Sequence, residues 1–431
     1  MPAMKTTLAI LLASVSFVAS AQLTSEEQRI VDAVKANNPA ALQLLERTVN
    51  VNSGTMNPEG VREVGRLFAE QFRGLGLETR WEEMPPDMHR AGHLVAWREG
   101  SRGKRLLLIG HLDTVFEKDS PVQAWDRRGD RVRGQGVSDM KGGDVIILEA
   151  LRALKAVGAL DGTTITVVFT GDEERVGDPI EAARAALVGA AKRSDAALAF
   201  EGTVRRNGQD TATIGRRSSS SWVVRVKGKQ GHSAGVFGEK AGYGAIYEGA
   251  RILDAFRKEL VEADLTFNPG VVLGGTAVTF DALAARGTAF GKNNVIANTF
   301  EVHGDLRYLS NEVRDRVRAR MREIVAASLP GTSAEITFRE SYPPMAPTEG
   351  NLRLLEMHSR ASADAGLGPI PALPPGERGA GDVQFVAPYV DCLDGLGATG
   401  SGSHSPDEDL EIASIERASI RAAILIYRLT R

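Results

Sequence analysis

The stretch Gly136-Val137-Ser138-Asp139-Met140-Lys141-Gly142-Gly143 sets one carboxylate between a glycine-containing turn and an apolar run of helical length. Continuous apolar runs at 105–110 and 164–170 stand on either side of it, and a third follows at 196–200. Runs of this kind are typical of strands that are covered on both faces by helices. With a helix expected at about 142–157, the pattern predicts an α/β fold built around a mostly parallel sheet.

Side chains able to bind a metal follow these expected strands. In open parallel sheets, ligands gather at the carboxyl ends of the strands. The carboxylate of Asp139 can bridge two cations, and the other candidates are His111, Glu173, Glu174, Glu201 and His404. Because the set offers nitrogen and oxygen ligands and contains no cysteine, it predicts a two-metal hydrolase site.

Two short motifs suggest how such a site would work. His111 and Asp113 are two residues apart, so on an extended strand end both side chains can point the same way. A carboxylate there can orient a metal-binding imidazole. Glu173 and Glu174 are adjacent and face differently, so one can bind metal while the other takes a proton from water and returns it to the leaving amine.

The length of 431 residues exceeds what one hydrophobic core usually supports, so two domains are expected. After a polar stretch at 215–221 the pattern changes to strands of mixed charge and amphipathic helices. We therefore predict a catalytic domain of residues 22–216 and 340–431, interrupted by an α+β domain of residues 217–339. A helix at 412–429 is expected to close the catalytic domain.

The net charge of the chain limits the classes of binding partner that can be expected. The formal net charge of -3 gives no electrostatic argument for binding nucleic acid or an anionic membrane surface, so a small-molecule substrate is expected. Cys392 is the single cysteine, which excludes an intrachain disulfide.

The first 21 residues are typical of a signal peptide. Lys5 supplies positive charge, Leu8 to Val18 is an apolar run too short to span a bilayer, and Ala19-Ser20-Ala21 fits the small-residue cleavage pattern. The sequence therefore predicts an exported, periplasmic or secreted protein whose mature form begins at Gln22 and has no membrane segment.

A competing motif is Gly231-His232-Ser233-Ala234-Gly235, which fits the Gly-x-Ser-x-Gly nucleophile elbow. That elbow requires a buried strand before it and a helix immediately after it. Here the preceding strand is half charged and glycines continue through Gly244. The metal-hydrolase hypothesis is therefore preferred to a serine hydrolase.

Taken together, the motifs resemble the signature set of the M20 family of dinuclear zinc peptidases, and they are most similar to its glutamate carboxypeptidase branch. The resemblance spans nearly all of the mature chain. The segments that carry it are His111-Leu-Asp113-Thr-Val, the turn around Asp139, Asp172-Glu173-Glu174, Phe200-Glu201-Gly202, Gly231-His232-Ser233-Ala234-Gly235 and Gly402-Ser-His404-Ser.

The resemblance implies roles for these residues in a zinc-exopeptidase catalytic domain that binds two zinc ions per subunit. Asp139 would bridge the ions. His111 and Glu201 would complete one metal site, and Glu174 and His404 the other. Glu173 would be the general base, and Asp113 the carboxylate that orients the histidine.

The resemblance also implies that the inserted domain is a lid through which two copies form a homodimer. His232 would reach the partner's active site to stabilise the oxyanion. Asn294 and Arg307 match lid positions that hold the substrate carboxylate or carbonyl. Arg307 is the expected carboxylate anchor.

The chain departs from the family pattern at three places. Some relatives have aspartate where this chain has Glu201. The usual Gly-Gly-x-Asp segment appears as Gly379-Ala380-Gly381-Asp382, and Tyr342 stands where an arginine usually precedes the pair Pro343-Pro344. Selectivity for a C-terminal glutamate is therefore not implied.

The sequence thus predicts an exported zinc metallocarboxypeptidase that cleaves a peptide or amide bond next to a free carboxylate. An aminoacylase-like amidohydrolase of N-acyl amino acids is the alternative within hydrolases. A binding protein on the same fold is less favoured, because loss of catalysis relaxes the requirement for paired carboxylates at one site.

Overall fold

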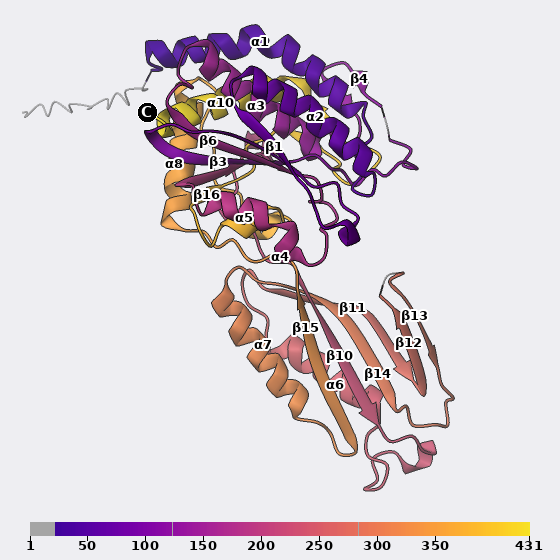
Figure 1. Ribbon diagram of the computed structural model, residues 1–431. Helices are drawn as coiled ribbons and strands as arrows, with labels where there is room; N and C mark the ends of the chain where they lie inside the picture. Colours follow the sequence, from indigo (N-terminus) through magenta and orange to yellow (C-terminus); the bar gives the residue numbers. More distant parts are fainter. Residues whose placement is uncertain (1–21, 123, 283) are drawn as a thin grey trace, which may run out of the picture.

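A six-stranded sheet forms the centre of the larger of two lobes in the computed structural model, which describes residues 22–122, 124–282 and 284–431 (Figure 1). The signal peptide expected at 1–21 lies outside these residues. In spatial order the strands are β1 (Glu78–Glu82), β2 (His93–Arg98), β6 (Thr163–Thr170), β3 (Arg102–His111), β7 (Ala196–Ala199) and β16 (Cys392–Leu393). The last four run parallel, which confirms the mostly parallel α/β fold.

The antiparallel edge of this sheet was not expected. Residues 78–98 contain no long apolar run and are not expected to form strands, yet β1 pairs antiparallel with β2, and β2 pairs antiparallel with β6. Trp81 supplies the physical reason, because its indole packs against the core and its Nε1 donates to the carbonyl of Ala91 at 2.8 Å. Burial of this one large side chain fixes an otherwise polar strand.

Helices cover both faces of the sheet. On one face α3 (Gly142–Ala156) and α10 (Ile412–Leu429) pack against β3, α1 (Ser25–Val49) lies over both of them, and α2 (Pro58–Gly74) covers β1 and β2. The helices of the other face are α4 (Ile180–Ala183), α5 (Ala185–Ala191) and α9 (Val383–Val386), and α8 (Glu349–Asp364) lies beside β16. Because α3 is enclosed between the sheet and α1, nearly all of its residues are buried.

Short elements at the rim of the larger lobe carry the loops of the site. A small sheet of order β17-β18-β5-β4 joins the C-terminal part of the chain to the segment before Asp139. Its strands are β4 (Asp126–Arg128), β5 (Arg131–Arg133), β17 (Gly400–Ser401) and β18 (Asp409–Glu411). The remaining short elements are η1 (Pro86–Met88), η2 (Val137–Lys141), η4 (Pro375–Glu377), β8 (Arg205–Arg206) and β9 (Gln209–Asp210).

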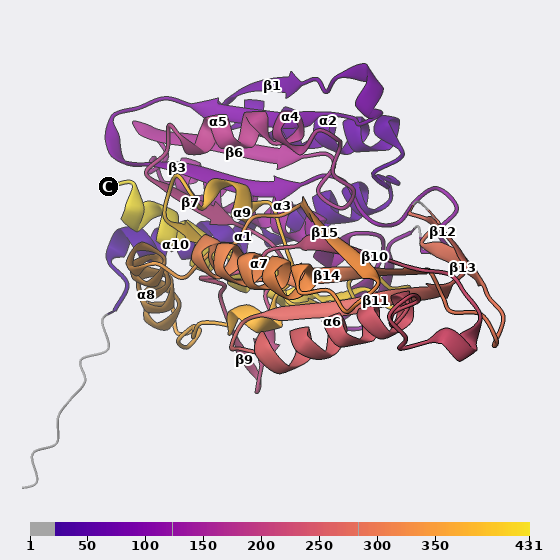
Figure 2. The ribbon, with the colours of Figure 1, turned by 90° about the horizontal axis from the view of Figure 1, so that it is seen from below.

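The smaller lobe is an antiparallel sheet of order β11-β14-β10-β15 with α6 (Ala245–Glu259) and α7 (Asn311–Ala326) beside it (Figures 1 and 2). Its strands are β10 (Ser220–Gly228), β11 (Thr266–Gly275), β14 (Thr299–Arg307) and β15 (Thr332–Glu340), with the turn η3 (Ser233–Gly235) and a hairpin of β12 (Ala277–Asp281) and β13 (Arg286–Phe290). The α+β insert is therefore confirmed as a separate antiparallel sheet. Its expected boundaries at 217 and 339 stay predictions, and β15 runs one residue past the second.

The strands of mixed charge expected in the insert are explained by burial on one face of its sheet. Along β10, Trp222, Val224 and Val226 are buried, whereas Arg225 between them is only half buried. Trp222 packs edge-on against Phe256 of α6, with ring centroids 5.7 Å apart. Within the described residues, no helix combines the length and apolar character needed to cross a membrane.

The core of the larger lobe provides a test of this packing. Leu425 of α10 is fully buried, whereas Leu352 of α8 is 49% exposed. We expect Leu425→Ala to lower the free energy of unfolding by about 2–5 kcal/mol, because it removes buried methyl groups and leaves a cavity. Leu352→Ala should change it by less than about 0.5 kcal/mol. Urea unfolding of both variants checks the difference, and equal losses would contradict the assigned packing.

Candidate metal centre

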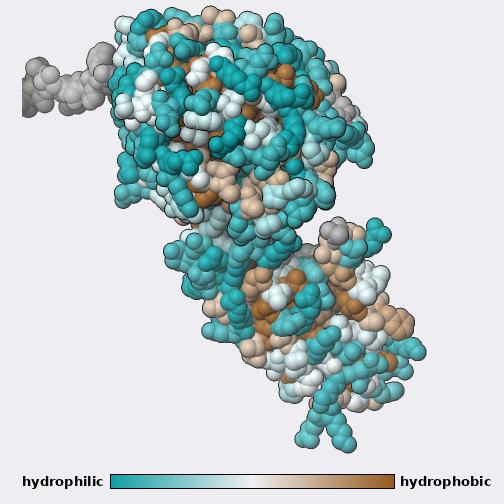
Figure 3. Space-filling view, viewed as in Figure 1, coloured by the Kyte–Doolittle hydropathy of each residue, from teal (hydrophilic) through white to brown (hydrophobic). Residues whose placement is uncertain are grey.

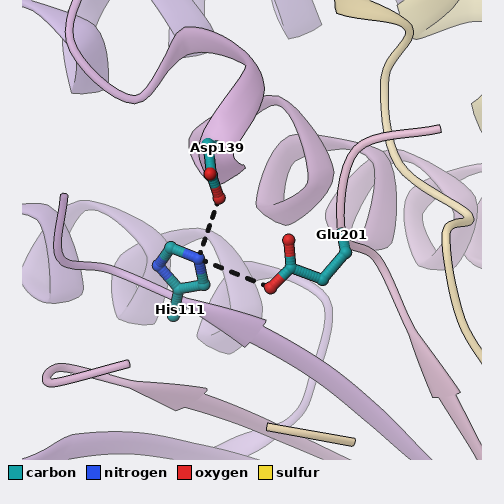
Figure 4. Close-up of side chains that lie close together, drawn as sticks. All are labelled: His111, Asp139 and Glu201. Carbon is teal, nitrogen blue, oxygen red and sulfur yellow. Dashed lines mark ion pairs between the residues drawn. The ribbon is translucent and has the colours of Figure 1, made fainter. Parts of the chain in front are cut away.

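His111 stands at the carboxyl end of β3 and faces two carboxylates from other segments (Figure 4). Its Nε2 lies 3.3 Å from Oδ1 of Asp139 and 3.7 Å from Oε1 of Glu201. The ring is buried, and Nε2 has no hydrogen-bond partner. A buried polar atom without a partner is costly, so this geometry is suited to a cation between the three groups.

His404, which lies near the C-terminus, faces the same carboxylate of Asp139. Its Nε2 lies 3.2 Å from Oδ2 of Asp139 and 3.1 Å from Oε2 of Glu174. The two oxygens of Asp139 therefore face two different imidazoles, which is the arrangement of a bridging carboxylate. His404 has a φ of 64°, in the left-handed region that side chains other than glycine rarely adopt, and strained backbone of this kind clusters at functional sites.

The structure thus brings all of the residues expected to bind metal into one place. Potential ligand atoms within 4.8 Å of one another form the sets His111, Asp139 and Glu201; Asp139, Glu174 and His404; and His111, Glu173 and Glu174. The first two sets coincide with the two sites named from the sequence. Imidazole and carboxylate donors suit zinc and other first-row divalent ions, and Oε1 of Glu174 is a further buried atom without a partner. The residues therefore fit a pair of divalent cations.

The carboxylates oppose one another electrostatically. Burial, together with neighbouring acids, raises the pKa of Glu173 and Glu174, and it raises the pKa of Glu201 to about 7. Burial also acts to raise the pKa of Asp139, but its pairing with the imidazoles of His111 and His404 outweighs this effect and holds that pKa well below its usual range. Hydrogen bonds with Asp139 and then Glu174 raise the pKa of His404 to about 11. The centre therefore holds more negative charge than its own imidazoles neutralise.

Asp113 positions both sides of the centre. Its carboxylate accepts hydrogen bonds from the backbone amides of Glu173 at 3.0 Å and Glu174 at 3.1 Å, and from the hydroxyl of Thr55 at 2.6 Å. Nδ1 of His111 lies 3.0 Å from the backbone carbonyl of Asp113 but 3.6 Å from its carboxylate. The residue therefore orients the imidazole mainly through its carbonyl, while its carboxylate fixes the loop that carries the two glutamates.

Sequence reasoning missed the buried groups that hold the loops. Oε1 of Glu408 accepts from the amides of Ser138 at 2.9 Å and Asp139 at 3.1 Å, across 270 and 269 residues of chain. Burial raises the pKa of Glu408 to about 8. The only sequence signal for this contact is that Glu408 lies four residues after His404.

A second buried group fixes the loop after β6. The guanidinium of Arg184 donates to Asp172 at 2.6 Å and to Asp382 at 2.7 Å, and all three side chains are buried. Asp382 belongs to the segment 379–382, which differs from the usual Gly-Gly-x-Asp pattern. The carboxylate of Asp382 nevertheless has a buried partner in Arg184. The hydroxyl of Tyr342, which replaces the usual arginine, donates to the carbonyl of Glu173 at 2.8 Å.

A cleft of about 980 Å³ opens above the centre and is lined by both lobes. Arg307 lies in its wall, as expected of a substrate-binding residue. His232 and Asn294 do not line it. They are neighbours of each other, because the amide of Ser233 donates to the carbonyl of Asn294 at 2.9 Å and His232 bridges to Val295. Their loops follow β10 and precede β14, at the end of the smaller lobe remote from the larger one (Figure 1).

This fold and site define a class: a metallohydrolase with an α/β catalytic domain, a candidate two-cation centre at the carboxyl ends of its parallel strands and an inserted antiparallel lobe above it. The model of the family described as "Peptidase family M20/M25/M40" matches residues 107–427. The chain therefore belongs to peptidase family M20/M25/M40, a family of metallopeptidases and amidohydrolases, and is a hydrolase of that class.

Curated relatives include carboxypeptidase G2 from Pseudomonas sp. (strain RS-16), which is 28% identical over 99% of this chain and 98% of its own length. Succinyl-diaminopimelate desuccinylase from Xanthomonas euvesicatoria is 28% identical over 77% of this chain and 85% of its own length.

Solved structures show the same fold. Aminopeptidase PepT from Bacillus cereus has a TM-score of 0.73 at 18% identity, covering 92% of this chain and 99% of that chain. The M20 family metallo-carboxypeptidase Sso-CP2 from Sulfolobus solfataricus has a TM-score of 0.63 at 16% identity, covering 90% and 99% respectively.

The protonation of the centre predicts how metal affinity depends on pH. At pH 7 the metal-free protein holds a proton on His404, whose pKa is raised to about 11, and a partial proton on Glu201, whose pKa is raised to about 7. A cation must displace both protons, so its affinity should rise as the pH rises from about 5.5 to 8.5. Titration calorimetry with Zn²⁺ in buffers of different protonation enthalpy should show proton release.

Two histidine variants test the assignment, one inside the centre and one outside it as a control. His404→Ala should reduce the number of bound ions and the protons released, whereas His89→Ala, at a residue outside every candidate metal set, should change neither. Affinity independent of pH in the unaltered protein would contradict the assignment.

Proposed function

We propose that the protein is a two-zinc exopeptidase that hydrolyses a peptide or amide bond next to a free C-terminal carboxylate. The observation that carries the proposal is Asp139, whose two oxygens face His111 and His404 while a separate carboxylate, Glu173, stands 3.9 Å from Nε2 of His111. The full-length similarity to carboxypeptidase G2 supports the carboxypeptidase assignment.

His111, Asp139 and Glu201 would hold one ion, and Asp139, Glu174 and His404 the other. When bound, the pair of cations supplies Lewis-acid polarisation of the scissile carbonyl and of the attacking water. Because its two oxygens face different imidazoles, Asp139 would contribute one oxygen to each position.

Glu173 is the proposed general base. Burial raises its pKa, which brings the carboxylate closer to the operating pH than an exposed glutamate would be. Its backbone is held on both sides, because its amide donates to Asp113 and its carbonyl accepts from Tyr342. The side chain can therefore take a proton from water and carry it to the leaving amine without movement of the loop.

A second candidate is the hydrolysis of N-acyl amino acids, as in an aminoacylase. The relatives named as succinyl-diaminopimelate desuccinylases favour it, since their name describes removal of an acyl group. A panel of dipeptides and N-acyl amino acids of the same C-terminal residue separates the two activities. Higher kcat/KM on the dipeptides supports the first candidate.

We also propose a homodimer in which the smaller lobe completes the partner's site. His232 and Asn294 do not line the cleft of their own chain, which supports a role for them at the site of a second copy. Most of the large apolar side chains exposed in the described chain belong to this lobe, where Figure 3 shows apolar surface; they are Phe237, Ile246, Tyr247, Val261, Val272 and Phe290. Exposed apolar surface of this kind marks interaction sites.

Export to the periplasm or the exterior is proposed from the N-terminal segment alone. There, the proposed enzyme would act on small peptides or N-acyl amino acids. Asn294 and Arg307 are proposed to contact such a substrate from the smaller lobes.

The base assignment is tested by Glu173→Ala. We expect kcat to fall by about 10²- to 10⁴-fold, because the other carboxylates of the centre would be occupied by the metal ions and could not take the proton. Both metal ions should remain bound, which metal analysis of the purified variant checks. Glu83→Ala, at an exposed glutamate on the same lobe, is the control. Appreciable turnover by the Glu173 variant would exclude its role as base.

Sharing of the site is tested by mixing two inactive variants, His232→Ala and Glu173→Ala. A mixed dimer contains one site with an intact Glu173 from one chain and an intact His232 from the other. Random exchange of subunits should therefore restore about a quarter of the original activity. If the exchanged mixture stays inactive, His232 does not act across a dimer.

A further inference from the structure

Five arginines line the cleft, and four of them are already paired. Each of the four donates a hydrogen bond of 2.6–3.0 Å to a different aspartate. The pairs are Arg131 with Asp409, Arg205 with Asp210, Arg216 with Asp394, and Arg307 with Asp305. These guanidinium groups therefore have partners within the protein itself.

Arg378 is the exception among the arginines of the described cleft. Its closest acid is Glu201, whose Oε2 lies 3.7 Å from Nη2, beyond hydrogen-bond distance. Its side chain is only 14% exposed, and its Nε is buried without a hydrogen-bond partner. Its guanidinium is thus held within the described chain by this longer ion pair alone and by no hydrogen bond. An enclosed guanidinium whose hydrogen bonds are unmade is costly, so this side chain is suited to an anion that arrives in the cleft.

The backbone that carries Arg378 is fixed. Arg216, buried and paired with Asp394, donates from Nη1 to the carbonyls of Gly379 and Ala380, each at 2.7 Å. The amide of Gly381 donates to Oε1 of Gln384 at 2.8 Å. A Cβ at Gly381 would lie 2.9 Å from the Arg216 guanidinium carbon, so only glycine leaves room for this contact. The backbone that follows Arg378 is therefore held in place before substrate binds.

Glu201 locates this group relative to the reaction. One carboxylate oxygen of Glu201 faces His111, and the other faces Arg378. Arg378 consequently stands directly beside the metal centre, on its outer side. An anion bound there would therefore lie close to the position proposed for the scissile carbonyl.

We propose that Arg378, on the larger lobe, binds the free α-carboxylate of the substrate and so confines cleavage to the bond next to the chain end. The inference rests on the proposed function and names a residue other than Arg307. Arg307 already donates to Asp305 on its own strand and is 33% exposed, whereas the Arg378 fork is free to make two parallel hydrogen bonds to a carboxylate.

The test compares a dipeptide that ends in a free carboxylate with the same dipeptide capped as a C-terminal amide. Arg378→Met should raise KM for the free acid about 10- to 100-fold, the range of a charge-assisted hydrogen bond, with a smaller effect on kcat. The amide-capped dipeptide should be hydrolysed equally by both proteins. Arg378→Lys should recover part of the loss, because it keeps the charge but not the fork.

Two matched variants separate the role of Arg378 from that of the other arginines in the cleft. Arg205→Met removes a paired arginine of the same cleft and should not alter the acid-to-amide preference. If Arg307→Met, rather than Arg378→Met, abolishes that preference, the anchor is Arg307 and the proposal is overturned. An equal loss on both substrates in Arg378→Met would show that the residue only supports Glu201, which also overturns it.

Binding separates this inference from the proposed function. Calorimetry on the zinc-loaded Glu173→Ala protein uses N-acetyl-alanine and N-acetyl-alanine amide as probes. We expect tighter binding of the acid, lost when Arg378→Met is added. If the unaltered enzyme hydrolyses no substrate but this difference persists, the proposed function fails and the subsite stands. If turnover is normal and the probes bind alike, the subsite fails alone.

Discussion

Four carboxylates share one desolvated space in this protein, and the rest of the site is arranged around that conflict. Asp139, Glu173, Glu174 and Glu201 cannot all be ionised there without opposing charge, because like charges in a low-dielectric environment repel strongly. In the protein alone, burial and then the neighbouring carboxylates raise the pKa values of the three glutamates. Divalent cations remove the conflict, so metal binding is expected to contribute to folding stability as well as to chemistry.

The scaffold maintains this cluster through the pairing of its central strands. His111 at the end of β3 lies opposite Thr170 at the end of β6, and the amide of Leu112 donates to the carbonyl of Thr170 at 2.7 Å. This register brings the loop of Glu173 and Glu174 to the histidine. Backbone amides then satisfy the carboxylate of Asp113, which would otherwise add a fifth unpaired negative charge.

Continuous apolar runs were sufficient to predict the buried parallel strands β3, β6 and β7, but not the buried strands β2 and β16, which are shorter or begin with a polar residue. The helix expected at 412–429 has those bounds in the structure. The half-exposed elements β1, β15 and α8 were not predicted, because their burial depends on tertiary neighbours and leaves no long apolar run. The residues of the candidate metal centre divide in the same way, into those that a local sequence pattern predicts and those that it does not. His111, Asp139 and His404 follow from motif and strand-end position. Glu408, Arg184 and Arg378 act through contacts with segments remote in sequence, which no local pattern records.

The division of the site between lobes has a mechanistic consequence. The metal-binding groups, the proposed base and Arg378 all belong to the larger lobe and are fixed by buried contacts. Arg307 and His232 belong to the smaller lobe, which is joined to the larger one by short connections (Figure 1). The chain end of a substrate can therefore be positioned without movement of the lobes. On the proposed function, contact with the reacting carbonyl would then be left to groups of the smaller lobe, which could complete the site around a substrate whose chain end is already in place.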